Sequence, residues 1–417
     1  MTRALVFSTL YPNAAQPNHG VFVENRLRKT LALGGLDATV LAPVPYFPID
    51  HPAFGRYAVF ARTPRQEVRH GVEVWHPRFP VIPKIGSSWT PDLLFRSALS
   101  AVRRLQAAGL TFDVIDAHYF YPDGVAAARL SEALRLPVVI TGRGTDLTLI
   151  PNEPGPRARI TWAIGRATAA LAVCDDLGQR LIALGAPESR TLVLRNGVDL
   201  DLFRPGDRAQ VRARFGLSGF TLLSVGALIP RKGHHLAIEA VAARPDCTLL
   251  IAGGGDQRAE LEALVRRSDV GDRVRLLGEV PHADLPALYS AADALVLASE
   301  REGWANVLLE AMACGTPVLA TDVNGTAEVV RAPEAGRLVA ERSAPAIAHA
   351  LDLLRADLPA REATRAYAER FGWEPIALAN RALLQAAARA GWDGRFDDKI
   401  VGEARDYLQA PGEPKGR

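Results

Sequence analysis

Residues 292–322 read ADALVLASEREGWANVLLEAMACGTPVLATD, and this stretch decides the fold. Two short apolar runs, ALVLAS and PVLATD, are typical of buried strands, and apolar residues at helical spacing fill the segment between them. A strand, a helix and a second strand in this order form the repeating unit of a parallel sheet that helices cover. Glu302 and Glu310 bracket the helix, and a core helix rarely tolerates an unpaired carboxylate because removing a charge from water is costly. The two acids are therefore either accidents of a surface or parts of a site.

The same alternation of strands and helices runs through the rest of the chain. It is interrupted at Pro205 and Gly206 and then restarts with FTLLSVGAL. Since 417 residues exceed what one hydrophobic core usually organises, we expect two doubly wound, Rossmann-like α/β domains, residues 1–204 and 205–373. Their ligand crevices, at the carboxyl ends of the strands, are expected to face each other across an interdomain cleft.

The C-terminal part of the chain does not continue the alternation of strands and helices. A helix over residues 374–391 has no strand partner, and residues 392–417, which end in APGEPKGR, are expected to form a partly disordered tail.

Composition excludes several classes of protein. The chain is 48% hydrophobic and 23% charged, as in ordinary globular proteins. A net charge of +3 is too mild to indicate a nucleic-acid partner. The three cysteines lie far apart, with no metal-binding spacing, and suit a reducing compartment. The first apolar run is broken at Pro12 and no apolar stretch is long enough to span a bilayer. We therefore expect a cytoplasmic protein with at most peripheral contact with a membrane surface.

Three short motifs place polar residues next to predicted strands. In VGALIPRKGHH, Arg231 and Lys232 precede a helix, where two cations can hold a phosphate, although a solvated loop would have the same composition. His118 follows a strand and can donate to a substrate hydroxyl or phosphate, or make a structural hydrogen bond. Asp199 and Asp201 resemble a metal-binding pair, but their position before the Pro–Gly break favours a turn.

The spacing of the two acids in the opening stretch suggests one elongated ligand. We expect the helix to begin near Trp304, which places Glu302 before its first turn and Glu310 about two turns in. At ~1.5 Å per residue the carboxylates would lie roughly 10–12 Å apart along the axis, with the unpaired N–H groups of the first turn between them. Such N–H groups bind anions. A nucleoside diphosphate sugar, with hydroxyls at both ends and charge in the middle, fits this layout.

The segment EGWANVLLEAMACGTPVLATDVNGTAEVV closely resembles the E-x7-E region of the retaining glycosyltransferases of family 4, which have the GT-B fold. Further family motifs follow in the family's order over about residues 1–375. They are YPNAAQPNHGVFVENRLRKTLALGG, DAHYFYPDGVAAARL, TGRGTDL, LRNGVDLDLFRP, VGALIPRKGHHLAIEA, IAGGGDQRAEL and VRLLGEVPHADLPALYSAADALVLAS.

The resemblance implies a role for each matching residue. The implied catalytic residues are His118, Lys232 and Glu302, and the implied donor-binding residues are Gly20, Arg231, Gly278, Val280, Gly303, Trp304, Ala305, Asn306 and Glu310. Glu302 would bind the hydroxyls of the donor sugar and Glu310 those of the ribose. Lys232 would neutralise charge on the departing diphosphate. No metal and no cofactor would be needed. Many relatives have Arg where this chain has Ala227, which puts the role of Arg231 in doubt.

The resemblance also implies an acceptor, which would lie against the N-terminal domain, and transfer with retention of anomeric configuration. It implies as well that the helix over residues 374–391 packs back on the N-terminal domain. A carbohydrate or lipid-linked acceptor of cell-envelope or exopolysaccharide synthesis is expected. The alternatives are a nucleotide-sugar epimerase or phosphorylase of the same fold and a non-catalytic nucleotide-sugar-binding partner of a synthase complex. A phosphorylase needs a pyridoxal-binding lysine, and only five lysines are present.

Overall fold

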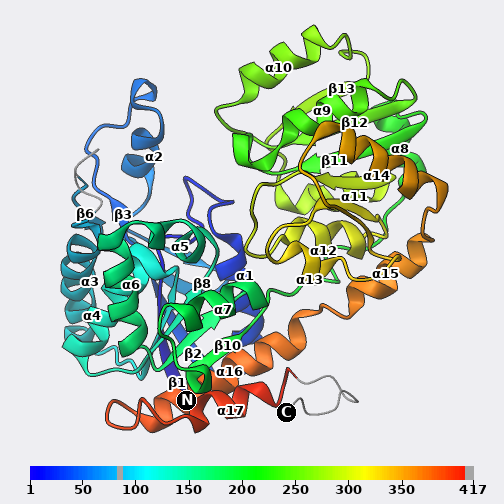
Figure 1. Ribbon diagram of the computed structural model, residues 1–417. Helices are drawn as coiled ribbons and strands as arrows, with labels where there is room; N and C mark the ends of the chain where they lie inside the picture. Colours follow the sequence, from blue (N-terminus) through cyan, green and yellow to red (C-terminus); the bar gives the residue numbers. More distant parts are fainter. Residues whose placement is uncertain (82–87, 409–417) are drawn as a thin grey trace. The chain divides into compact units, whose positions relative to one another are not determined.

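The computed structural model describes residues 1–81 and 88–408, which form two compact units (Figure 1). One unit comprises Met1–Asn196 and Trp373–Arg417, and the other is Gly197–Gly372. The second unit thus begins eight residues before the expected boundary at residue 205. The reason is local pairing, because the Val198 N–H donates to the Phe371 carbonyl at 2.9 Å and Phe203 is buried against His282 and Tyr289.

The first unit is built on an eight-stranded sheet with the strand order β10-β9-β8-β7-β1-β2-β5-β4. Every described pairing in it is parallel except that of β4 with β5. Its strands are β1 (Thr2–Phe7), β2 (Leu36–Leu41), β4 (Gln66–Arg69), β5 (Val72–Trp75), β7 (Val114–His118), β8 (Val138–Gly142), β9 (Ala169–Ala172) and β10 (Thr191–Val193). From β1 the chain proceeds first to β2 on one side and later to β7 on the other. The β1/β7 pair is therefore the topological switch point of this sheet.

Helices cover both faces of the first sheet. The helices are α1 (Val21–Ala32), α3 (Thr90–Ala107), α4 (Val125–Leu134), α5 (Thr145–Thr148), α6 (Pro154–Arg166), α7 (Asp175–Ala183), α16 (Trp373–Ala390) and α17 (Lys399–Arg405). Helices α3, α4 and α6 contact one another, whereas α1, α16 and α17 form a second group. Helix α16 is the one expected over residues 374–391. Its apolar face packs against α1 and β1, so the last long helix of the chain belongs to the first unit (Figure 1).

The tail expected over residues 392–417 contains a helix in its described part. Helix α17 buries Ile400, Val401 and Ala404 against α16. These three residues share one helical face, and their burial explains why the segment is ordered. Residues 409–417 lie outside the described part of the chain.

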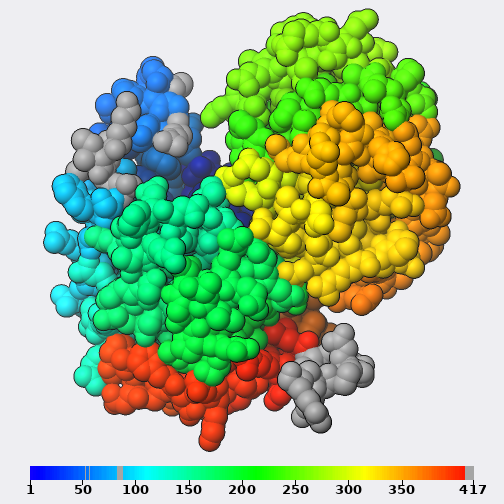
Figure 2. Space-filling model, in the orientation of Figure 1, coloured from blue at the N-terminus to red at the C-terminus, as the bar shows by residue number. Residues whose placement is uncertain are grey.

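Residues 43–81 follow β2 and belong to the first unit. They contain the β4–β5 hairpin, a two-stranded parallel pair of β3 (Val44–Pro45) with β6 (Arg78–Phe79), and the short helix α2 (Arg56–Arg62). Figure 2 shows the part around α2, in blue, projecting from the body of the first unit.

The second unit is a six-stranded sheet with the order β13-β12-β11-β14-β15-β16, and all its described pairings are parallel. The strands are β11 (Phe220–Val225), β12 (Cys247–Ala252), β13 (Val274–Gly278), β14 (Ala294–Leu297), β15 (Val318–Thr321) and β16 (Gly336–Val339). The helices are α8 (Arg208–Phe215), α9 (His234–Ala242), α10 (Arg258–Arg267), α11 (Leu285–Ala291), α12 (Asn306–Ala313), α13 (Thr326–Val329), α14 (Ala344–Ala356) and α15 (Arg361–Glu369). The switch point lies between β11 and β14. The loops after these two strands are therefore where a ligand is expected.

Candidate active site

The loop that follows β11 carries Lys232 to the switch point. It forms a short 3-10 turn over Pro230–Lys232, and α9 begins immediately after Gly233. Gly233 has a φ of 70°, and a Cβ added to it would lie 2.1 Å from the carbonyl oxygen of Ala298. Only glycine fits there, and its close approach holds the Lys232 loop against the end of β14.

The loop after β14 supplies Glu302, which meets Lys232 directly. The Lys232 Nζ and Ser299 Oγ atoms donate to the same carboxylate oxygen, Glu302 Oε1, at 2.5 and 2.6 Å. The Arg231 guanidinium lies 3.9 Å from the other oxygen, Oε2, and donates at 2.9 Å to the Arg301 carbonyl. Two cations thus share one nearly buried carboxylate. Its Oε2 is too far from Arg231 for a hydrogen bond and keeps acceptor capacity for a hydroxyl.

Helix α12 starts at Asn306, two residues later than expected. Trp304 and Ala305 precede it with buried side chains, and the Trp304 ring packs 6.4 Å, centroid to centroid, from that of Phe371. The side chains of Trp304 and Ala305 are therefore core residues. Along residues 303–305, the backbone is the part of the chain that a ligand could meet.

Glu310 is buried in the middle of α12, where both of its carboxylate oxygens have partners. His282 Nε2 lies 3.2 Å from Oε1, and the Tyr289 hydroxyl donates to Oε2 at 2.8 Å. Burial alone would lower the pKa of His282. The hydrogen bond and charge of Glu310, with the charge of Asp199, outweigh burial and raise that pKa above its ordinary value of 6.5.

This pairing predicts a pH-dependent contribution to stability. Because the pKa of His282 is raised in the folded protein, the contribution is complete below about pH 6.5 and is lost as pH rises through the folded pKa. His282→Phe keeps an aromatic ring beside Phe203 but removes the imidazole that binds the titrating proton. The difference in unfolding free energy between wild type and this variant should be largest at acidic pH and shrink in alkaline buffer. A difference that grows with pH would contradict the assignment.

Two further residues of the implied donor site lie at and just after the end of β13. Gly278 is its last residue, with a φ of 79°, and its carbonyl accepts from the Gly253 N–H at 2.7 Å. Val280 follows in the loop and is half-buried. The same loop continues into the 3-10 turn His282–Asp284, so it leads directly to the partner of Glu310.

His118 and Gly20 belong to the first unit. His118 ends β7, at the switch point, but its ring is 1% exposed, with Arg143 Nη2 at 2.9 Å from Nδ1 and Asp116 Oδ2 at 3.6 Å from Nε2. Burial, with the charges of Arg143 and Arg26, lowers its pKa well below the ordinary value. Gly20 precedes α1 with a φ of 72°, and a Cβ there would lie 2.3 Å from the Leu10 carbonyl oxygen.

The structure therefore brings together Arg231, Lys232 and Glu302, and it joins Glu310 to His282 and Tyr289. The last two, with Ser299 and Arg143, are site residues that sequence reasoning did not single out. A signal existed for Arg143 and Ser299, because each follows a strand that neighbours a switch point. The pairing of Tyr289 with Glu310 joins two helices and has no local signal.

Three observations concern Asp199, possible metal ligands and the length of the apolar helices. Asp199 Oδ1 accepts from the N–H groups of Asp201 and Leu202 at 3.2 and 3.3 Å, as in a turn. Among residues 1–81 and 88–408, no group of three or more His, Cys, Asp or Glu side chains is arranged to hold a metal ion. Over the same residues, no helix combines the length and apolar character needed to cross a membrane.

Comparison with known proteins identifies the family. Residues 208–371 match the family model of the glycosyl transferases group 1, and residues 54–202 match that of glycosyltransferase family 4. The chain is also 32% identical over 330 residues to D-inositol 3-phosphate glycosyltransferase of Mycobacterium tuberculosis, covering 73% of this chain and 67% of the relative. The chain is a family 4 glycosyltransferase. A putative teichuronic acid biosynthesis glycosyltransferase, TuaC of Bacillus subtilis, is 29% identical to it over 84% of this chain and 88% of the relative.

Solved structures show that this glycosyltransferase has the GT-B fold. It superposes on sucrose-phosphate synthase of Thermosynechococcus elongatus with a TM-score of 0.78 and 23% identity, covering 94% of this chain and all of the other. HepE of Anabaena, solved in complex with UDP, matches with a TM-score of 0.69 and 20% identity over 93% of this chain and all of the other.

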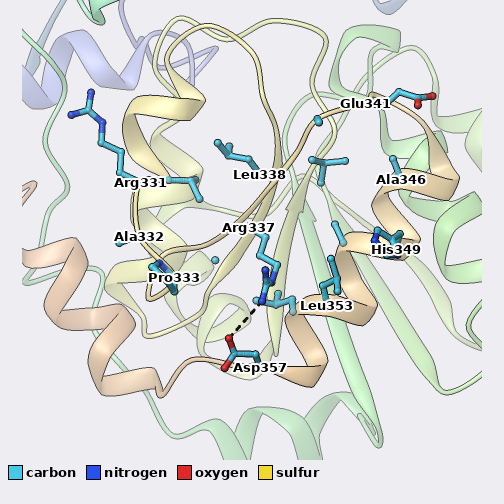
Figure 3. A pocket seen from close by; sticks show the side chains of 16 residues that line it. Arg331, Ala332, Pro333, Arg337, Leu338, Glu341, Ala346, His349, Leu353 and Asp357 are labelled. Atoms are coloured by element: carbon cyan, nitrogen blue, oxygen red, sulfur yellow. Dashed lines mark ion pairs between the residues drawn. The ribbon is translucent and has the colours of Figure 1, made fainter.

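One pocket of the second unit is separate from these residues. It has a volume of about 690 Å³ and lies between β16 and α14, with Arg337 paired to Asp357 at 3.6 Å on its wall (Figure 3). None of the predicted site residues lines it. Cavity size alone therefore does not indicate where the glycosyltransferase works.

Proposed function

We propose that this glycosyltransferase moves a sugar from a nucleoside diphosphate to an acceptor, with retention of anomeric configuration and without a metal ion. The observation that carries the proposal is the cluster of Lys232, Arg231 and Glu302 at the switch point of the second sheet. A cation pair beside a carboxylate suits a ligand that is anionic at one end and rich in hydroxyls at the other.

In the proposed reaction, the bond between the anomeric carbon and the diphosphate oxygen breaks and its electron pair stays with the diphosphate. The acceptor hydroxyl oxygen bonds to the same face of that carbon, and its proton passes to the departing diphosphate. Negative charge grows on the departing diphosphate, and Lys232, held in place by Glu302, stabilises it. The second oxygen of Glu302 would accept from a sugar hydroxyl. Arg231 would add a second positive charge from the position next to Lys232, which offsets the missing arginine at Ala227.

Glu310 would bind the ribose of the donor. Its carboxylate is fixed by Tyr289 and His282, and each oxygen has further lone pairs for a ribose hydroxyl. A buried carboxylate held by two donors is preorganised, which lowers the ordering cost of binding.

We further propose that the acceptor is a carbohydrate or lipid-linked carbohydrate of the cell envelope or an extracellular polysaccharide. The similarity to TuaC, whose name places it in teichuronic acid biosynthesis, supports this acceptor class. We place the protein in the cytoplasm, with peripheral contact at a membrane surface when the acceptor is lipid-linked.

The test is a thermal-shift panel of UDP-, GDP- and ADP-sugars in buffer with EDTA, followed by NMR of the product from the donor that binds. We expect one base to give a clearly larger shift than the others, and the product to keep the anomeric configuration of the donor. Inversion would refute the retaining mechanism, and a shift that requires a divalent cation would refute metal independence. No shift with any donor would refute the nucleotide-sugar assignment.

A further inference from the structure

A group of buried and partly buried polar side chains lies at the carboxyl ends of β7, β8 and β10 in the first unit. It consists of Arg26, Asp116, His118, Arg143 and Asn196. Two of its members are guanidinium groups. Neither has a carboxylate within 4 Å in the described part of the chain, which is unusual because buried charges are normally paired.

The unpaired guanidinium of Arg26, on α1, is explained by a structural role. Its side chain is 1% exposed, and Nη2 donates to the Leu194 carbonyl at 2.7 Å and to Asn196 Oδ1 at 3.0 Å. Burial lowers its pKa to about 10 and raises that of Asp116 to about 6, while the opposite charges of the two residues moderate both shifts. No ligand can reach Arg26 without displacing the core, so it ties α1 to the end of β10.

Arg143 differs because it follows β8 directly and is partly exposed. Nη1 donates to Asn196 Oδ1 at 3.0 Å and Nη2 donates to His118 Nδ1 at 2.9 Å. Of the five N–H bonds of a guanidinium, these contacts use two, and the described residues provide no acceptor for the other three. Its two acceptors are neutral groups. Its own positive charge has no carboxylate within 4 Å among the described residues, and the charges of Asp116 and Asp146 that favour its protonated form act from beyond that distance.

The Arg143 side chain is nevertheless held in one place. The Asp146 carboxylate accepts from the backbone N–H groups of Arg143 and Gly144, at 3.1 and 2.7 Å, which fixes the turn after β8. The ring of Phe22 lies 5.0 Å from the guanidinium carbon. A guanidinium group that several contacts hold in one orientation, and that has no anion beside it, is preorganised to bind an anion.

The contact with Arg143 also determines what His118 can do. A guanidinium only donates, so Nδ1 must be the acceptor and the ring proton must be on Nε2, facing Asp116. Nδ1 is thus held by Arg143, whereas Nε2 lies 3.6 Å from Asp116 Oδ2, beyond hydrogen-bond distance. In this arrangement the Nδ1 contact of His118 orients Arg143.

We propose that Arg143 binds an anionic group, a phosphate or carboxylate, of a substrate of the transfer reaction, and that His118 is its positioning residue. The proposal rests on the proposed function only in assigning that anion to a transfer substrate. Two sources share this chemistry, namely the diphosphate of the donor and an anionic group on the acceptor.

The test titrates inorganic phosphate into the full-length protein by calorimetry, in an Arg231→Ala, Lys232→Ala background that lacks both predicted phosphate-binding cations of the second unit. Arg143→Gln should weaken phosphate binding about tenfold or more, as expected for a lost charge-assisted contact. Arg166→Gln removes the same charge from an exposed position paired with Glu132 and should change nothing. If Arg143→Gln does not fold, Arg143→Lys, which keeps the charge but loses the fork, should bind phosphate measurably more weakly. Unchanged phosphate binding in the folded Arg143 variant would overturn the proposal.

Repeating the titration with saturating UDP, GDP or ADP separates the two sources. Phosphate that is displaced by the nucleotide indicates the donor diphosphate, and phosphate that still binds indicates an anionic acceptor. If none of the nucleotides binds, the proposed function fails. The phosphate titration of the nucleotide-free protein still decides the role of Arg143.

Two substitutions of His118 test its positioning role. His118→Asn keeps an acceptor at the place of Nδ1, whereas His118→Gln places its amide near Nε2. If His118 acts through Arg143, the Asn variant should retain phosphate binding and the Gln variant should behave like Arg143→Gln. The reverse ranking would show that His118 acts through Nε2 and would overturn this part of the proposal.

Discussion

Replacing Lys232 with alanine should lower kcat for sugar transfer by roughly 10²–10³-fold, the range measured when one preorganised group that stabilises developing charge is removed. Lys232 Nζ lies 2.5 Å from Glu302, which fixes its position before substrate arrives. Charge on the departing diphosphate is larger in the transition state than in the bound donor. The substitution should therefore lower kcat strongly and change the KM for the donor much less.

The matched control is Lys399→Ala, which removes the same charge from an exposed position on α17. It should transfer sugar at the wild-type rate. Thermal unfolding of the Lys232 variant must be measured in parallel, because the nearly buried Glu302 loses a partner. A folded Lys232→Ala protein with kcat within a few-fold of wild type would remove the residue from the mechanism.

Replacing Glu310 should remove the preference of the enzyme for a ribonucleotide. If Glu310 binds the ribose hydroxyls, wild type should bind a nucleoside diphosphate more tightly than its 2′,3′-dideoxy analogue. Hydrogen bonds to a charged group predict a preference of about 10- to 150-fold. Glu310→Gln and Glu310→Ala should bind the two ligands nearly equally.

This comparison separates binding from folding, since Glu310 also anchors His282 and Tyr289. Any general disturbance of α12 would weaken both ligands alike, and only a direct contact would affect their ratio. Glu239→Ala, an exposed acid on α9, serves as the control. A Glu310 variant that still discriminates against the dideoxy analogue would place the ribose elsewhere.

The sequence allowed the α/β class, the two units and the Lys232–Glu302 region to be predicted, because these depend on local patterns. Apolar runs of strand length and glycine-terminated helices recur along the chain, and the ends of parallel strands gather at one edge of each sheet. Gly233 illustrates the limit, since its need for a positive φ can be guessed but its contact with Ala298 cannot.

What could not be predicted depends on pairs of residues far apart in the chain. The turn at Val198 belongs to the second unit because it pairs with Phe371, 173 positions later, so a break at Pro205 misplaced the boundary. Burial of His118 and its contact with Arg143 likewise follow from the packing of β7 against β8. A histidine after a strand looks available in the sequence, and only the packed sheet shows that Nδ1 of this ring is held by Arg143.

The most direct test of the central claim measures release of nucleoside diphosphate from UDP-, GDP- and ADP-sugars, with water as the acceptor of the sugar, by wild type and Lys232→Ala protein in EDTA. Wild type is predicted to release one nucleoside diphosphate in preference to the others, with no metal present, and the variant to release it at least a hundredfold more slowly. Equal release by both proteins, or release by wild type only after a divalent cation is added, would contradict the account.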